Sequence, residues 1–221
     1  MKNPGVSALA AALGLGITAC NEVPTSTAPG EHQPLFRAAA KSTAPVVTFA
    51  DPEGDAVGTS QLVRTDNGVS VKLSTTGLEP GTAATLWIII FNEPDSCTAP
   101  ECGEDDLFRA EPLPDVMYLG GRVVGGTGGA TFAGHRAEGD NSRSLWAVLG
   151  VASPSPGLID ARKAEIHLVV RNHGPLIRGL IGEMTSTFNG GCLLDGLPVN
   201  QLIGTPGPNT CEDVQFVVHT P

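Results

Sequence analysis

The chain has 221 residues, of which 41% are hydrophobic and 16% are charged, and its formal net charge is −10 at pH 7. Nucleic-acid binding needs clustered lysine and arginine, and the 13 basic residues form no such stripe, so we expect no nucleic-acid partner. The 28 glycines and 18 prolines, without a long helical period, favour many turns and an all-β domain.

Residues 1–19 have the pattern of a signal peptide. Lys2 supplies a basic start, and an apolar run of mostly small residues extends from Val6 to Ala19. A membrane-spanning helix needs about 20 apolar residues, so this run is too short for a permanent span. It is typical of the hydrophobic region of a signal peptide, which is removed from the mature protein.

The end of this run, Ile17-Thr18-Ala19-Cys20, resembles the lipobox of bacterial lipoprotein precursors. The resemblance implies that Cys20 receives a diacylglyceryl group, that cleavage follows Ala19, and that the domain is held at the membrane of the cell envelope. Two or three acyl chains anchor stably, at ~0.8 kcal/mol per buried CH₂. In a Gram-negative organism, Asn21 favours the outer membrane. The alternative is an ordinary secretory signal with Cys20 incidental.

Residues 20–44 are rich in proline, threonine, serine and alanine. This composition predicts a lipidated N-terminus followed by a flexible linker. We expect the folded domain to span Pro45–Pro221, which is long enough to bury a core.

Short runs of β-branched and aromatic residues alternate with turn residues from Pro45 onward. Asp66-Asn67-Gly68 predicts a tight hairpin, and Gly125–Gly129 a second one. Ala83–Asn92 is apolar on both alternating faces, which predicts a central strand covered on both sides. The expected strands are Val46–Ala50, Gln61–Thr65, Val69–Thr75, Ala83–Asn92, Met117–Val124, Ala130–His135, Leu145–Val151, Ala164–Asn172, Leu180–Phe188 and Val214–His219.

This succession of short strands favours an antiparallel two-layer β-sandwich, immunoglobulin-like in broad shape. A β-barrel is the alternative.

Four cysteines remain besides Cys20, and an even number in an exported domain predicts two disulfides. Three pairings are possible. We favour Cys97–Cys102 and Cys192–Cys211, because each pair brackets one polar loop. Free thiols or a zinc site are the alternatives.

The loop from Asn92 to Asp106 concentrates carboxylates, the kind of ligand that Ca²⁺ prefers. Its spacing does not match the twelve-residue calcium loop, which needs glycine at its sixth place and glutamate at its twelfth. We therefore expect a solvated acidic loop.

Strand alternation places ionisable residues along one face of Ala164–Asn172 and its continuation. Glu165, His167, Val169, Arg171 and His173 share that face, while the intervening apolar residues take the other. Such a row can hold a metal or a general base, and His135 can join it from another strand. More often, such histidines make local hydrogen bonds or pair with a carboxylate.

Several segments together resemble a family of uncharacterised bacterial exported proteins. They are Thr85–Trp87 with Phe91–Pro94, Cys97 with Cys102–Asp105, Ala164–Arg171 with His173–Pro175, Thr187–Cys192, and Val214–His219. The resemblance covers most of Pro45–Pro221 and implies an exported protein. It implies no catalytic residue.

The sequence lacks the Walker pattern, the dinucleotide-binding glycine pattern and the Gly-x-Ser-x-Gly elbow, so we assign no cofactor and no catalytic residue. The leading hypothesis is a lipid-anchored binding or structural module of the cell envelope, with its ligand unspecified. The alternative is an envelope metalloprotein or enzyme that uses His135, His167, His173 and nearby carboxylates.

Overall fold

The computed structural model describes residues 37–149, 156–194, 196–197 and 199–221. Cys20 and the rest of the predicted lipobox lie outside these residues. The strands are β1 (Ala40–Thr48), β2 (Gly58–Thr65), β3 (Gly68–Thr75), β4 (Thr82–Phe91), β5 (Pro114–Val123), β6 (Ala130–Ala137), β7 (Glu165–Pro175) and β8 (Glu212–His219). The helices are η1 (Pro94–Ser96), η2 (Glu104–Phe108), α1 (Leu145–Leu149) and α2 (Ile181–Met184).

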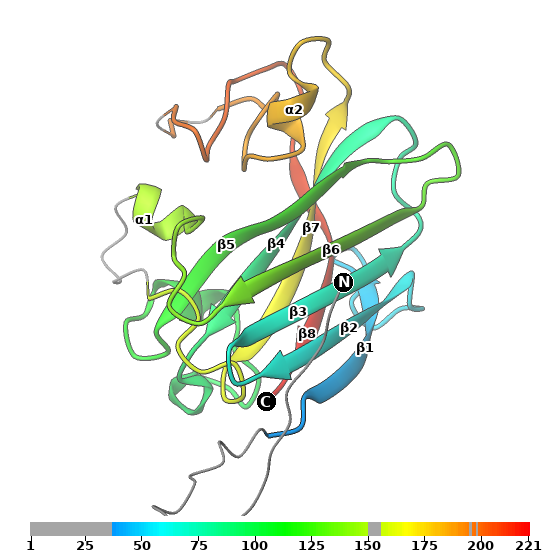
Figure 1. Cartoon of the computed structure of the whole chain (residues 1–221). Coiled ribbons are helices and arrows are strands. Elements are labelled where there is room, and N and C mark those ends of the chain that lie inside the picture. The colour runs from blue at the N-terminus through cyan, green and yellow to red at the C-terminus, as the bar shows by residue number, and fades with distance from the viewer. Residues whose placement is uncertain (1–36, 150–155, 195, 198) are drawn as a thin grey trace, which may run out of the picture. The chain divides into compact units, whose positions relative to one another are not determined.

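All these strands belong to one antiparallel sheet, in the order β5-β4-β7-β8-β1-β2-β3-β6. β1 joins two halves of the sheet, because Ala40–Val46 pairs with β2 whereas Val47 and Thr48 pair with β8. β5 and β6, at opposite ends of this order, also lie side by side (Figure 1). The predicted all-β antiparallel fold is confirmed. The two layers are halves of one rolled sheet. This sheet is nearly closed, so the fold is close to the barrel alternative.

Side chains, rather than a backbone ladder, join β5 to β6. Arg122 Nε donates to the Thr131 carbonyl at 2.7 Å, and Arg136 Nη2 donates to the Tyr118 carbonyl. A Cβ on Gly134 would lie 2.6 Å from the Leu119 side chain, so this glycine permits the close approach. The predicted hairpin between these strands is therefore wrong. The chain turns at Gly125–Gly129, but β6 pairs with β3 and β5 with β4.

The main core fills the interior of the rolled sheet. Ile88 of β4, Leu168 of β7 and Leu73 of β3 are all fully buried there. A second apolar cluster lies on the outer face of β4 and β5, where Trp87 packs with Trp146 and Ile203. The predicted burial of both faces of the central strand is thus confirmed.

A polar cluster fills the space between β2 and β8 where β1 changes its pairing partner from β2 to β8. Buried Arg64 donates to four carbonyls, those of Ala161 and Ala164 at 2.7 Å, His219 at 3.0 Å and Thr220 at 3.1 Å. These bonds attach β2 to β8 across the gap between the strands.

Buried His219 lies in the same cluster and connects β8 with β1 and β2. Its Nδ1 lies 2.9 Å from Ser42 Oγ on β1, and its Nε2 lies 2.9 Å from Ser60 Oγ on β2. Burial, aided by the positive charge of Arg64, lowers the pKa of His219 to about 4. The ring is therefore neutral at physiological pH.

Two predicted strands are wrong. Leu145–Leu149 of the expected strand Leu145–Val151 forms helix α1, and the expected strand Leu180–Phe188 contains helix α2 followed by turns. Ser144 Oγ accepts from the Ala147 amide at 3.1 Å and so caps α1. A short apolar run does not by itself distinguish a buried helix from a strand.

The folded domain begins earlier than predicted. β1 starts at Ala40, so residues 40–44 of the expected linker belong to the sheet. They pair with Ser60–Arg64 of β2 although they contain no large apolar side chain. Backbone pairing with β2 places this segment, and the composition of the segment does not reveal that pairing.

Candidate functional site

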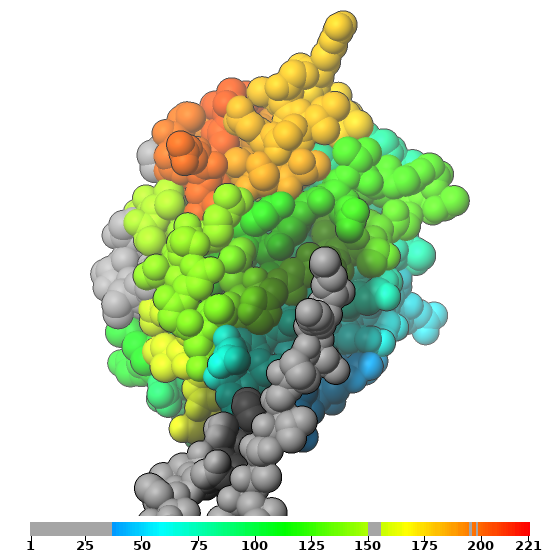
Figure 2. All heavy atoms as spheres, viewed as in Figure 1, coloured from blue at the N-terminus to red at the C-terminus, as the bar shows by residue number. Residues whose placement is uncertain are grey.

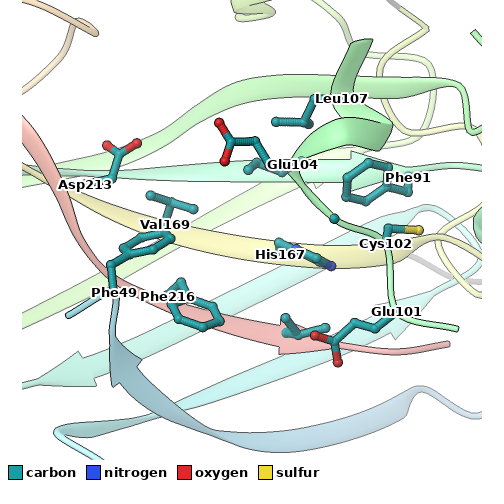
Figure 3. Close-up of a pocket in the computed structure, with 13 residues that line it drawn as sticks. Phe49, Phe91, Glu101, Cys102, Glu104, Leu107, His167, Val169, Asp213 and Phe216 are labelled. Carbon is teal, nitrogen blue, oxygen red and sulfur yellow. The ribbon is translucent and has the colours of Figure 1, made fainter. Parts of the chain in front are cut away.

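An apolar groove lies on the outer face of the sheet, with a volume of about 340 Å³. Its floor consists of Ile89 and Phe91 of β4, His167 and Val169 of β7, and Phe216 and Val218 of β8. Phe49, just after β1, and Leu107 of η2 form its walls, and Glu101, Glu104 and Asp213 stand at its rim (Figure 3). The Phe49 and Phe216 ring centroids are 4.8 Å apart. The groove therefore combines an aromatic lining with carboxylates at its rim.

Strand alternation on β7 places His167 in this groove. Ile166, Leu168 and Val170 are buried in the main core, which leaves the row from Glu165 to His173 on the outer face. The predicted division of this strand into two faces is confirmed.

The two predicted disulfides, Cys97–Cys102 and Cys192–Cys211, are both present. They indicate that the domain folds in an oxidising, exported compartment. In the described part of the chain, no helix is long and apolar enough to span a membrane.

Buried Asp106 organises the acidic loop beside the groove. Its carboxylate accepts from the Thr98 amide at 3.0 Å, the Gly103 amide at 2.9 Å and Arg109 Nη1 at 2.8 Å. Burial opposes its ionisation, but these hydrogen bonds, with one from the Thr98 hydroxyl, outweigh that effect and hold the pKa of Asp106 at about 2. The loop is thus ordered internally, with Glu101 and Glu104 exposed.

Glu165 connects this loop to the floor of the groove. The carboxylate is buried, and its Oε1 accepts from the Cys102 amide at 2.8 Å and from His167 Nε2 at 2.7 Å. The His167 ring also meets Phe91 edge-on, with centroids 5.2 Å apart. The hydrogen bond to Glu165 and the contact with Phe91 together hold the His167 ring in the floor of the groove.

His173 lies in a separate, buried chain of hydrogen bonds. Trp87 Nε1 donates to Thr85 Oγ1 at 2.8 Å, and Thr85 Oγ1 lies 2.8 Å from His173 Nε2. His173 Nδ1 lies 3.1 Å from the Gly190 carbonyl. Because indole nitrogen only donates and a carbonyl only accepts, the threonine hydrogen points to Nε2 and the ring hydrogen is on Nδ1. Burial lowers the pKa of His173 to about 4.

The predicted metal or acid–base candidates do not all come together. Glu165 and His167 are in contact, His173 bonds Thr85, and exposed His135 lies on β6 with its Nδ1 3.0 Å from Ser70 Oγ. Among the described residues, one group of three potential ligands is close enough to share a metal ion, namely His173, Cys192 and Cys211. Its two sulfurs are bonded to each other.

Sequence reasoning missed the groove because its parts come from distant segments. Phe49, Glu101 and Asp213 are brought together only by the order of strands in the sheet. One local signal was present. Phe216 and Val218 are apolar on the face opposite to buried Val217, which indicates that the outer face of β8 is also apolar.

Comparison of the chain with protein-family models, with curated proteins and with solved structures found no match.

Proposed function

We propose that this protein is a cell-envelope lipoprotein whose folded domain binds a ligand in the apolar groove. The observation that carries the proposal is an aromatic-lined hollow of about 340 Å³ on the outside of the sheet. Phe49, in its wall, is 47% exposed. Covering apolar surface is favourable by about 25 cal/mol per Å², and ligand sites are typically hollows of this size and lining.

The proposed anchor is a diacylglyceryl group on Cys20. The lipobox pattern Ile17-Thr18-Ala19-Cys20 supports it, together with the disulfides that indicate export. β1 starts at Ala40, so residues 21–39 would serve as the linker between membrane and domain. Asn21 favours the outer membrane in a Gram-negative organism. We also propose that the chain belongs to the family of exported bacterial proteins that it resembles.

The alternative function is an envelope metalloprotein or enzyme. The specific observation in its favour is the Glu165–His167 pair, since His167 lines the groove. His135 and His173 have other partners and do not join this pair. Metal analysis of the purified protein tests the metalloprotein. Less than about a tenth of an equivalent of metal, with thermal stability unchanged by chelation, excludes the metalloprotein, because a bound metal stabilises the folded state by mass action.

Binding in the groove can be tested with Nile red, a neutral apolar dye, on residues 20–221 carrying Cys20→Ser. We expect Phe49→Ala to weaken dye binding about tenfold, because an aromatic wall is lost. Phe108→Ala is the matched control, since Phe108 is 69% exposed and does not line the groove. Equal losses in the two variants, or no binding by the unsubstituted protein, would contradict the proposed groove.

The anchor has a separate test. Cys20→Ser should abolish labelling by radioactive palmitate and move the protein from the membrane to the soluble fraction. Retention in the membrane fraction would exclude lipid attachment at this residue.

A further inference from the structure

We infer that the groove binds an extended protein segment that carries basic side chains on either side of apolar ones. This inference rests on the proposed binding function and specifies the chemistry of its ligand. Length, lining and charge of the groove each contribute to it.

The groove is long rather than compact. At one end, Asp213 pairs with Arg171 of β7, and at the other, the Cys102 amide binds Glu165 of the same strand. Glu165 and Arg171 are six residue steps apart on β7, which corresponds to about 20 Å at ~3.3 Å per residue. With a volume of about 340 Å³ spread over that length, the groove is shallow. Its length matches about seven extended residues and exceeds the reach of a single small ammonium ion.

The lining of the groove can contact every second side chain of an extended segment. Its middle consists of apolar side chains from three neighbouring strands, including Val169 and Phe216. In an extended chain, every second side chain points to the same side. Apolar residues at alternate positions would therefore contact the floor while their neighbours face solvent.

The charge of the rim selects basic residues. Glu101 and Glu104 are exposed, and neither forms an ion pair within the described part of the chain. Asp213 accepts from Arg171 at 2.9 Å and is 42% exposed at its side chain. The whole chain has a net charge of −10, so the surrounding field also attracts cations. Figure 3 shows Glu101 and Asp213 toward different ends of the groove, with apolar side chains between them.

Fluorescence anisotropy with a labelled peptide tests the inference. The probe is Lys-Ser-Leu-Ser-Phe-Ser-Lys, blocked at both ends, with residues 20–221 carrying Cys20→Ser. We expect Glu101→Gln with Glu104→Gln to weaken its binding about tenfold. The matched control is Glu53→Gln with Glu79→Gln, which removes the same charge from exposed glutamates outside the groove and should change the affinity by less than about twofold.

Two further ligands complete the test. A peptide with glutamate in place of both lysines should bind at least about tenfold more weakly, and rising salt should reduce this difference. Phenylpropyl-trimethylammonium, a small aromatic cation, should bind more weakly than the basic peptide. Equal binding of the lysine and glutamate peptides, or of the small cation and the peptide, overturns the inference.

Nile red separates this failure from failure of the proposed function. If the dye binds and Phe49→Ala weakens it, but the lysine peptide has no advantage, the groove is a binding site and the inferred ligand is wrong. If neither the dye nor any peptide binds, the proposed function itself is overturned.

Discussion

Acid should destabilise this protein through His173 and His219. Both rings are buried and neutral, and the pKa of each is about 4 in the folded state, against an ordinary value of 6.5. In the unfolded chain the rings take up protons below pH 6.5, whereas the folded protein does so only near pH 4. The free energy of unfolding therefore falls as the pH falls through this window.

The magnitude follows from the difference in pKa, 6.5 − 4 = 2.5 units. At 1.36 kcal/mol per unit, each histidine removes about 3 kcal/mol of stability between pH 6.5 and pH 4. Protonated His173 would also carry a hydrogen on Nε2, where Thr85 already donates. The raised pKa of buried Asp115 acts in the opposite direction, since its folded carboxyl binds a proton more readily than the unfolded one.

Urea unfolding at several pH values from 7 to 4, followed by tryptophan fluorescence, measures this loss. His173→Asn should reduce the pH slope by about half, because one of the two titrating rings is gone. His135→Asn is the control, since His135 is exposed on β6, and it should leave the slope unchanged. If His173→Asn and the unsubstituted protein show the same slope, the buried ring is not the source of the acid sensitivity.

Three further changes should lower stability measurably in urea unfolding at pH 7. Arg64→Met should cost about 3 kcal/mol, because four carbonyls lose a buried donor, and a cost below about 1 kcal/mol would contradict that role. Gly134→Ala should cost about 2 kcal/mol by forcing β5 away from β6, whereas Gly126→Ala, with open space around it, should cost little. Cys192→Ser with Cys211→Ser should cost about 3 kcal/mol, and an unchanged urea midpoint would argue against the bridge.

The parts of the fold that the sequence predicts are those with a local cause. Asp66-Asn67-Gly68 connects β2 and β3 as expected, because these residues suit a tight turn. The alternation on β7 is confirmed because one face is in the core. Both disulfides join cysteines that are close in sequence.

The errors have non-local causes. The turn at Gly125–Gly129 is visible in the sequence, but the preference of β6 for the edge of β3 is not. The apolar residues Leu145 and Trp146 are buried in a helix against the outside of β5, and their apolar character alone fits a strand equally well. The groove depends on side chains from four distant segments, so the sequence predicted proximity only within a segment, as for His167 and Val169 on one face of β7.

The pairing of β1 with β8 has a consequence for how the protein folds. Ser42 and His219, which meet at this junction, are 177 residues apart in sequence. Contacts of such separation form slowly, because a long loop must be closed before they contribute. Until β8 inserts between β7 and β1, both neighbouring strands expose unpaired backbone edges that can recruit other chains. We therefore expect the interval before β8 inserts to be the time at which a newly exported chain is most prone to aggregation.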